Sequence, residues 1–295
     1  MKTLAEILER ALPRCIQQGR DETLLLPSTE SDIALALELA AAQGARISPP
    51  GAAPVEGAIR LDLRRMQDIL SVDEISRIVH VQAGATLAAV ETTLRRRSLT
   101  LGMAAESLEP PIGEWIAGGT RGGRSGEDDP IDQMIAGLQA VLADGRALRI
   151  RPAPRRAVGP DLLAAIRGSG GRIAIVTAVH LVARARLDSK ELAFLFAEPN
   201  AAEATLAWIR GEGVFPARSA LIPTAEGMAL RIWLEAKGGI LAARETLVRR
   251  LAEARGGVGI EPAEAPPIPS EAAPAVSGIV EALAKRLDPS GVLGA

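Results

Sequence analysis

The chain has 295 residues, of which 47% are apolar, and a formal net charge of −2 at pH 7. This length and apolar content suffice for one large or two modest domains, and the near-neutral charge gives no sign of nucleic-acid or acidic-membrane binding. Cys15 is the single cysteine and there are only two histidines, which excludes an internal disulfide and argues against a metal centre such as zinc. Tyrosine is absent, so no phenol can serve as a catalytic acid or base.

The first hundred residues predict alternating helices and short strands. Residues 3–18 predict an amphipathic helix, and the charges at Glu6, Glu9 and Arg10 distinguish it from a secretory signal. Because no uncharged run is long enough to cross a bilayer, we expect a cytoplasmic protein. The pattern then predicts strands at 24–26, 46–48 and 58–63, a helix that starts within 28–32 and ends near 42, a hairpin over 69–81 and a helix over 87–97.

The middle of the chain holds its most informative stretch. Glycines and prolines are frequent over 98–131, which predicts a long loop, and a hairpin with its turn at Asp144-Gly145 follows. Residues 159–181 read GPDLLAAIRGSGGRIAIVTAVHL, which predicts a helix start, a glycine turn at 168–171 and a buried strand. Exposed backbone N–H groups in such a turn suit a phosphate or the edge of a flavin. An ordinary helix–strand turn is the alternative.

Beyond about residue 186 the pattern becomes that of a second, smaller domain. Strand, helix, strand, strand and helix follow one another, which is typical of a small antiparallel sheet backed by helices. A segment rich in proline and alanine and one last helix to about residue 286 follow. We therefore expect a larger domain over 1–185, a small one over 186–260 and a linker over 261–275, with 270–295 packing back on the larger domain.

Several motifs, in order along the chain, are similar to those of one family. They are LPSTESD at 26–32, LDLRRM at 61–66, VQAGAT at 81–86, VLADG at 141–145, the stretch 159–181 and LDPSGVL at 287–293. Together they resemble the FAD-binding domains of the vanillyl-alcohol-oxidase (PCMH-type) flavoproteins. The most similar types are alkyl-dihydroxyacetonephosphate synthase, D-lactate dehydrogenase and the FAD-binding subunit of glycolate oxidase.

The resemblance implies an α+β chain: a two-subdomain PCMH-type FAD-binding fold with a small ferredoxin-like (β-α-β-β-α) cap domain. It also implies oxidation of a small 2-hydroxy acid or alcohol by hydride transfer to the flavin. FAD would be held mainly by backbone groups of three segments. The residues implied are Pro50, Gly51, Ala52, Ala53 and Pro54 in the first, Gly113, Ala117, Gly118, Gly119, Thr120 and Gly122 in the second, and Gly168, Ser169, Gly171, Ile173 and Ile175 in the third.

The first segment departs most from the family's pattern. The family's pyrophosphate loop typically reads P-R-G-G-G-T, and residues 49–54 here read PPGAAP. Ala52 and Ala53 add Cβ atoms where a glycine lets the backbone approach a phosphate closely. Pro50 and Pro54 each lack an N–H donor.

The other two segments contain substitutions as well. Glu114 replaces a glycine in the second segment and would bring negative charge near the diphosphate, while Trp115 would either pack on the cofactor or occupy its place. In the third segment Arg172 adds a charge that suits a phosphate, and Ala174 stands at a glycine position.

Few side chains are candidates for contact with a substrate, and no catalytic residue is assigned. Arg121, Arg124 and Arg172 could grip a carboxylate or phosphate, because guanidinium is bidentate and always charged; a solvated loop surface is the alternative. His80 and His180 are expected on strands, where a structural role is favoured over a catalytic one.

Alternative functions stay open. The first is an FAD-linked oxidoreductase subunit of the glycolate oxidase or D-lactate dehydrogenase type. The second is a non-catalytic family member that serves as a partner-binding or regulatory subunit without flavin, and a third is another small-molecule binder that uses the old flavin cleft. Because the second half of the family is short here, we expect a partner subunit that completes the cleft.

Overall fold

The computed structural model describes residues 3–19, 22–52, 55–103, 108–119, 134–153, 162–265 and 278–293. These residues form two compact units, each with its own hydrophobic core. The first unit contains the described residues up to 184 and those after 271. The second unit contains the described residues of 185–271.

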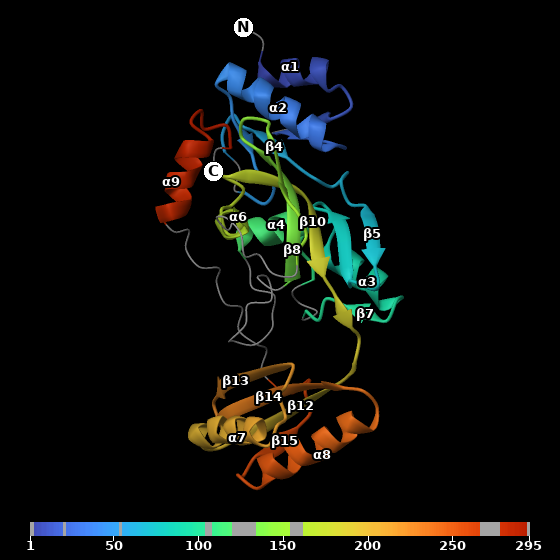
Figure 1. Ribbon diagram of the computed structural model, residues 1–295. Coiled ribbons are helices and arrows are strands. Elements are labelled where there is room, and N and C mark those ends of the chain that lie inside the picture. Colours follow the sequence, from blue (N-terminus) through green and yellow to red (C-terminus); the bar gives the residue numbers. More distant parts are fainter. Residues whose placement is uncertain are drawn as a thin grey trace. The chain divides into compact units, whose positions relative to one another are not determined.

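The first unit starts with a four-stranded sheet in the order β1-β2-β4-β3. The inner strand β4 runs parallel to β2 and to β3, and β1 is antiparallel to β2. Two helices, α1 and α2, contact each other, and each begins with a capping box, at Thr3 and at Thr29 (Figure 1). The elements are α1 (Leu4–Ala11), β1 (Ile16–Gln18), β2 (Thr23–Leu25), α2 (Glu30–Gln43), β3 (Ile47–Ser48) and β4 (Ile59–Leu61).

The prediction of one helix over 3–18 is wrong beyond Ala11. Pro13 disfavours helical backbone at the residue before it, and Leu12 has a φ of −132°. Residues Ile16–Gln18 form β1 instead, with Ile16 opposite Leu25 of β2.

A five-stranded antiparallel sheet in the order β5-β6-β10-β8-β9 forms the larger part of the first unit. Side chains of its three inner strands, among them Val81, Leu138 and Val179, are fully buried in the core, and most positions of β8 and β10 are buried. Helix α4 packs against β10 (Figure 1). The elements are β5 (Ile69–Asp73), β6 (Ile78–Gln82), α3 (Leu87–Arg95), α4 (Ile112–Gly118), β8 (Ile135–Leu142), β9 (Ala147–Ile150), α6 (Leu162–Ile166) and β10 (Ala174–Val182).

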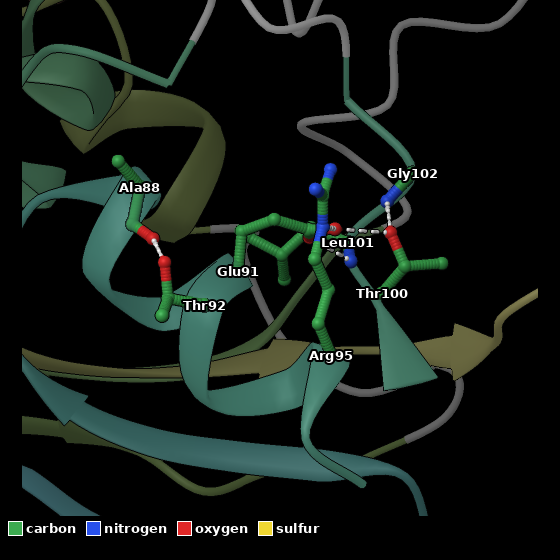
Figure 2. Close-up of polar contacts among 7 residues, drawn as sticks. All are labelled: Ala88, Glu91, Thr92, Arg95, Thr100, Leu101 and Gly102. Atoms are coloured by element: carbon green, nitrogen blue, oxygen red, sulfur yellow. Dashed lines mark hydrogen bonds and ion pairs between the residues drawn. The ribbon is translucent and has the colours of Figure 1, made fainter. Parts of the chain in front are cut away.

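The stretch 98–131 is not one long loop, because its described parts contain β7 (Leu99–Thr100) and α4. Glu91 of α3 is only 5% exposed and anchors this stretch (Figure 2). Its carboxylate accepts hydrogen bonds from Thr100 Oγ1 at 2.7 Å and from the Leu101 N–H at 2.8 Å, and it pairs with Arg95 at 2.9 Å. The Ala88 N–H donates to the Leu108 carbonyl at 2.9 Å, so α3 also holds the start of the segment that leads into α4.

The described C-terminal residues return to the first unit. Helix α9 (Gly278–Leu287) and the residues after it place Val280, Val292 and Leu293 in the first core. The Ile47 N–H of β3 donates to the Val292 carbonyl at 2.8 Å, and the Asp288 carboxylate accepts from the N–H groups of Val292 and Leu293.

The second unit is a four-stranded antiparallel sheet in the order β13-β14-β12-β15, with α7 and α8 on one side of it (Figure 1). Phe194, Leu230 and Ile232 lie in one core with residues of both helices. The strand β15, which the sequence did not predict, pairs with β12 and completes the β-α-β-β-α-β order of a ferredoxin-like sheet. The elements of the second unit are β12 (Asp188–Phe196), α7 (Pro199–Gly211), β13 (Arg218–Thr224), β14 (Gly227–Ala236), α8 (Gly239–Glu253) and β15 (Val258–Ile260). The two-residue strand β11 (Arg184–Ala185) lies where the first unit ends.

Helices and strands thus mix without regular alternation, and the predicted α+β class is confirmed. Within the described ranges, no helix has both the length and the apolar character needed to cross a membrane.

Candidate functional site

The first predicted cofactor segment is a tight turn that follows β3. Gly51 has a φ of +74°, and the Ala52 N–H donates to the Pro49 carbonyl at 3.2 Å. A proline at the second position, here Pro50, followed by a residue with positive φ is the pattern of a type II turn. The turn therefore requires glycine at 51, whereas Ala52 does not adopt a positive φ.

The second segment forms α4, and backbone from another motif holds its first turn. The N–H groups of Ile112 and Gly113 donate to the carbonyls of Ala85 and Ala83, at 2.9 and 2.8 Å. These N–H groups would otherwise lack partners, since the first turn of a helix has none of its own. The VQAGAT motif at 81–86 therefore positions α4.

The third segment is the glycine turn after α6, and it closes on the end of α4. The Gly168 N–H donates to the Ile116 carbonyl at 3.1 Å, and the Gly170 N–H donates to the Ala117 carbonyl at 2.9 Å. Gly119, at a φ of +66°, lies so close that a Cβ on it would be 2.9 Å from the Gly168 Cα. Both the conformation and the close approach require glycine there.

The first segment contacts both of the others. A Cβ placed on Gly171 would lie 2.4 Å from the Pro49 Cβ, so the first and third loops touch. A Cβ placed on Gly51 would lie 3.0 Å from the Glu114 Cγ, so the first loop also touches α4. The three segments, far apart in the sequence, therefore meet around α4.

Most of the predicted cofactor residues fall in these contacting segments. They are Pro50, Gly51, Ala52, Gly113, Ala117, Gly118, Gly119, Gly168, Ser169 and Gly171. Ile173 and Ile175, by contrast, are 2% and 1% exposed and pack in the hydrophobic core. Ala53, Pro54, Thr120 and Gly122 lie outside the described residues, as do the substrate candidates Arg121 and Arg124. The role of each residue in cofactor binding stays a prediction.

Buried polar atoms without partners mark the same region. Among the described residues, Ser169 Oγ in the third loop, Trp115 Nε1 in α4 and Ser48 Oγ just before the first loop lack a hydrogen-bond partner. An unpaired buried polar group costs roughly 1–3 kcal/mol, so a ligand or water that pairs with it is favoured. These atoms and the glycine-lined loops fit a phosphate-bearing cofactor bound through backbone groups. Ser48 is not among the residues predicted from the sequence, and its position next to the first loop is the only local signal for it.

Two carboxylates of opposite character lie near the first loop. Burial and the charge of Asp62 raise the pKa of the half-buried Glu114. Burial also acts to raise the pKa of Asp62, but hydrogen bonds from the Arg64 side chain and backbone outweigh it and hold that pKa below its usual value. The charged form of Asp62 is therefore stabilised by hydrogen bonds, whereas the charged form of Glu114 is destabilised by burial and by the charge of Asp62.

Arg172 carries a positive charge directly after the third loop. Its Nε donates to the Ser169 carbonyl at 3.2 Å, and its side chain is half-buried. This bond fixes one edge of the guanidinium against the loop, and the group has further N–H donors for an anion.

The two histidines stack on the five-stranded sheet. His80 of β6 and His180 of β10 are opposite each other, with ring centroids 4.0 Å apart and ring planes at 7°. His80 Nε2 lies 3.2 Å from Gln139 Nε2 of β8. Burial lowers the pKa of both rings, and the charge of His80 lowers that of His180 further. These contacts agree with a structural role for the pair.

Residues 22–151 match the family described as FAD binding domain, and the fold matches that of PCMH-type FAD-binding proteins, so the predicted resemblance is confirmed. The family match and the FAD-linked relatives support FAD as the cofactor.

Three known proteins, among others, are similar to this chain in sequence. The chain is 35% identical over 126 residues to the Uncharacterized FAD-linked oxidoreductase YgcU of Escherichia coli (strain K12), covering 42% of this chain and 26% of YgcU. It is 25% identical over 242 residues to the alkyldihydroxyacetonephosphate synthase of Dictyostelium discoideum, covering 78% and 39%. It is 29% identical over 191 residues to the mitochondrial D-2-hydroxyglutarate dehydrogenase of Arabidopsis thaliana, covering 60% and 34%.

A solved structure of alkyldihydroxyacetonephosphate synthase shares the fold. Its TM-score is 0.69 at 20% sequence identity, covering 88% of this chain and 55% of the other. The chain thus spans about a quarter to two-fifths of these curated relatives and about half of that structure.

Proposed function

We propose that this chain is an FAD-linked oxidoreductase that oxidises a small alcohol or 2-hydroxy acid. The observation that carries the proposal is the meeting of three glycine-containing backbone segments around α4 in an FAD-binding domain. FAD-linked oxidoreductases and a D-2-hydroxyglutarate dehydrogenase among the relatives support the reaction class. When bound, FAD would accept the hydride that the substrate loses.

The chain's own residues would hold and orient the two ligands. Backbone groups at Gly51 and Gly171 would face the diphosphate, since the N–H groups of residues 168–170 donate to carbonyls of the fold, and Ser169 Oγ is a buried hydroxyl that could bond to the cofactor. Arg172, fixed to the third loop, would bind the carboxylate of a 2-hydroxy acid or a phosphate oxygen. No described contact and none of the relatives named above supports a partner subunit, which is left out of the proposed function.

A visible spectrum tests the proposal in two stages. Purified protein titrated with FAD should acquire the absorbance of bound flavin. Under anaerobic conditions a panel of small 2-hydroxy acids and alcohols should then bleach that absorbance for at least one compound. Bound flavin that no compound reduces would contradict the proposed substrate class. Absence of flavin binding would overturn the proposed function and favour the alternative of a non-catalytic family member without flavin.

An arginine variant makes the substrate assignment sharper. Arg172→Gln should weaken reduction by a carboxylate-bearing substrate, and Arg167→Gln, on the same turn, is the matched control. An equal loss in both variants would contradict a specific role for Arg172.

A further inference from the structure

Glu114 lies directly against the first loop. Its Cγ, Cδ and Oε2 lie 3.0–3.2 Å from the position that a Cβ on Gly51 would occupy. Gly51 is the residue whose positive φ shapes the turn, so the carboxylate is next to the backbone that a diphosphate would have to approach.

The Glu114 carboxylate has little to neutralise it. Among the residues that the structure describes, it makes no hydrogen bond or ion pair. Half-burial removes part of its water, and an anion that loses water without gaining a partner is destabilised.

The neighbouring charges are engaged elsewhere. Asp62 adds negative charge near Glu114, while the side chain and backbone N–H of Arg64 bond to Asp62. Arg60 attracts Glu114, and its guanidinium also lies 3.5 Å from Glu22. Within the described ranges, Arg60 and Arg64 are therefore paired with carboxylates other than Glu114.

We propose that Glu114 determines how tightly this chain holds FAD: its carboxylate repels the diphosphate at the first loop, so that FAD binds weakly and exchanges. The inference rests on the proposed function and adds a specificity residue to it. An anionic cofactor must displace the Glu114 side chain or share the loop with its charge. Removal of that charge removes the repulsion without altering the glycine loops.

Two substitutions separate charge from size. Glu114→Gln keeps the shape and removes the charge, and Glu114→Ala removes both. Glu109→Gln makes the same change at an exposed position just before α4 and is the matched control. Dissociation constants for FAD are measured by titration of flavin fluorescence on the full chain, and thermal unfolding without FAD confirms that each variant is folded.

Glu114→Gln should bind FAD about tenfold more tightly than the wild type, the change expected from one charge–charge repulsion near a protein surface. Glu114→Ala should gain at least as much, and Glu109→Gln should match the wild type. A gain that appears only in Glu114→Gln and Glu114→Ala, and shrinks at high salt, supports the inference.

Other outcomes overturn the inference in distinguishable ways. If the wild type binds FAD and Glu114→Gln binds it no more tightly, the inference fails and the proposed function stands. A gain in Glu114→Ala alone would mean that size, not charge, is the obstacle, which also overturns it. If neither the wild type nor any variant binds FAD, both the inference and the proposed function fail. If both Glu114 variants bind FAD and the wild type does not, the repulsion is supported, and the proposed function fails for the natural chain because this carboxylate blocks its site.

Discussion

The two sides of the candidate site are built in different ways. On one side, α4 and the third loop are joined by backbone hydrogen bonds and by the contact of Gly119 with Gly168. On the other side, the first loop faces the Glu114 side chain, and a positive φ at Gly51 is its main local requirement. A substitution of Gly119 therefore disturbs the fold, whereas a substitution of Glu114 changes mainly the charge that a ligand meets.

The largest effect is expected where Gly119 meets the third loop. Gly119→Ala puts a Cβ 2.9 Å from the Gly168 Cα at a φ of +66°. Adding the conformational penalty to the strain of the contact, we expect a loss of about 3 kcal/mol in the free energy of unfolding. Urea denaturation followed by circular dichroism measures it.

Gly170→Ala is the matched control for this prediction. Gly170 has nearly the same φ, +62°, but a Cβ there would meet nothing within 4 Å. Only the conformational penalty remains, about 1 kcal/mol. Equal losses in the two variants would show that the contact between α4 and the third loop does not hold this side together.

For α4 and the third loop, features with local sequence signals could be predicted, whereas contacts between distant segments could not. The glycine turn at 168–171 and the capped start of α2 at Thr29 have local signals, and both were predicted. The helix α4 was missed because it lies among glycines and has no side-chain cap. The Ala83 and Ala85 carbonyls satisfy its first N–H groups, and no local pattern reveals a partner about thirty residues away.

The proximity of Glu114 to Gly51 has the same kind of origin. Alignment with the family placed a carboxylate in the second segment, but its contact with the first loop follows from the tertiary packing of α4. Likewise β15 has only three residues, Val258–Ile260, and its pairing with β12 is what makes it a strand. Periodicity cannot identify so short an element.

The second prediction tests whether α3 holds the segment leading into α4. Glu91→Ala would leave the buried Leu101 N–H and the Thr100 hydroxyl without their acceptor (Figure 2). We expect a loss of about 2 kcal/mol in the free energy of unfolding, the cost of unsatisfied buried donors. Glu91→Gln, which retains one oxygen acceptor, should lose less. Glu245→Gln in α8 serves as the control, because Glu245 also pairs with an arginine four residues later at 2.9 Å. If Glu91→Ala and the control have the same free energy of unfolding, the hydrogen bonds of Glu91 do not stabilise the fold.

The smallest effect concerns pH and contrasts Glu114 with the histidine pair. Burial raises the pKa of Glu114, so the folded state binds more protons than the unfolded state and this group destabilises the fold as pH rises. Burial lowers the pKa of His80 and His180, so the unfolded state binds more protons. The two histidines therefore destabilise the fold as pH falls below 6.5, the ordinary pKa of histidine. Between about pH 7.5 and 5.5 the wild type should lose about 2 °C in Tm from the histidines.

The double variant His80→Gln/His180→Gln removes both histidines of the chain and should flatten this part of the pH profile. Glu114→Gln should leave it intact and differ from the wild type mainly in FAD affinity. Parallel Tm curves for the wild type and the double variant would mean that the stacked rings titrate as they do in the unfolded chain. In that case the two rings would have to be as hydrated in the folded protein as in the unfolded chain. The stacked geometry with one ring nitrogen, His180 Nδ1, buried without a described partner argues against such access.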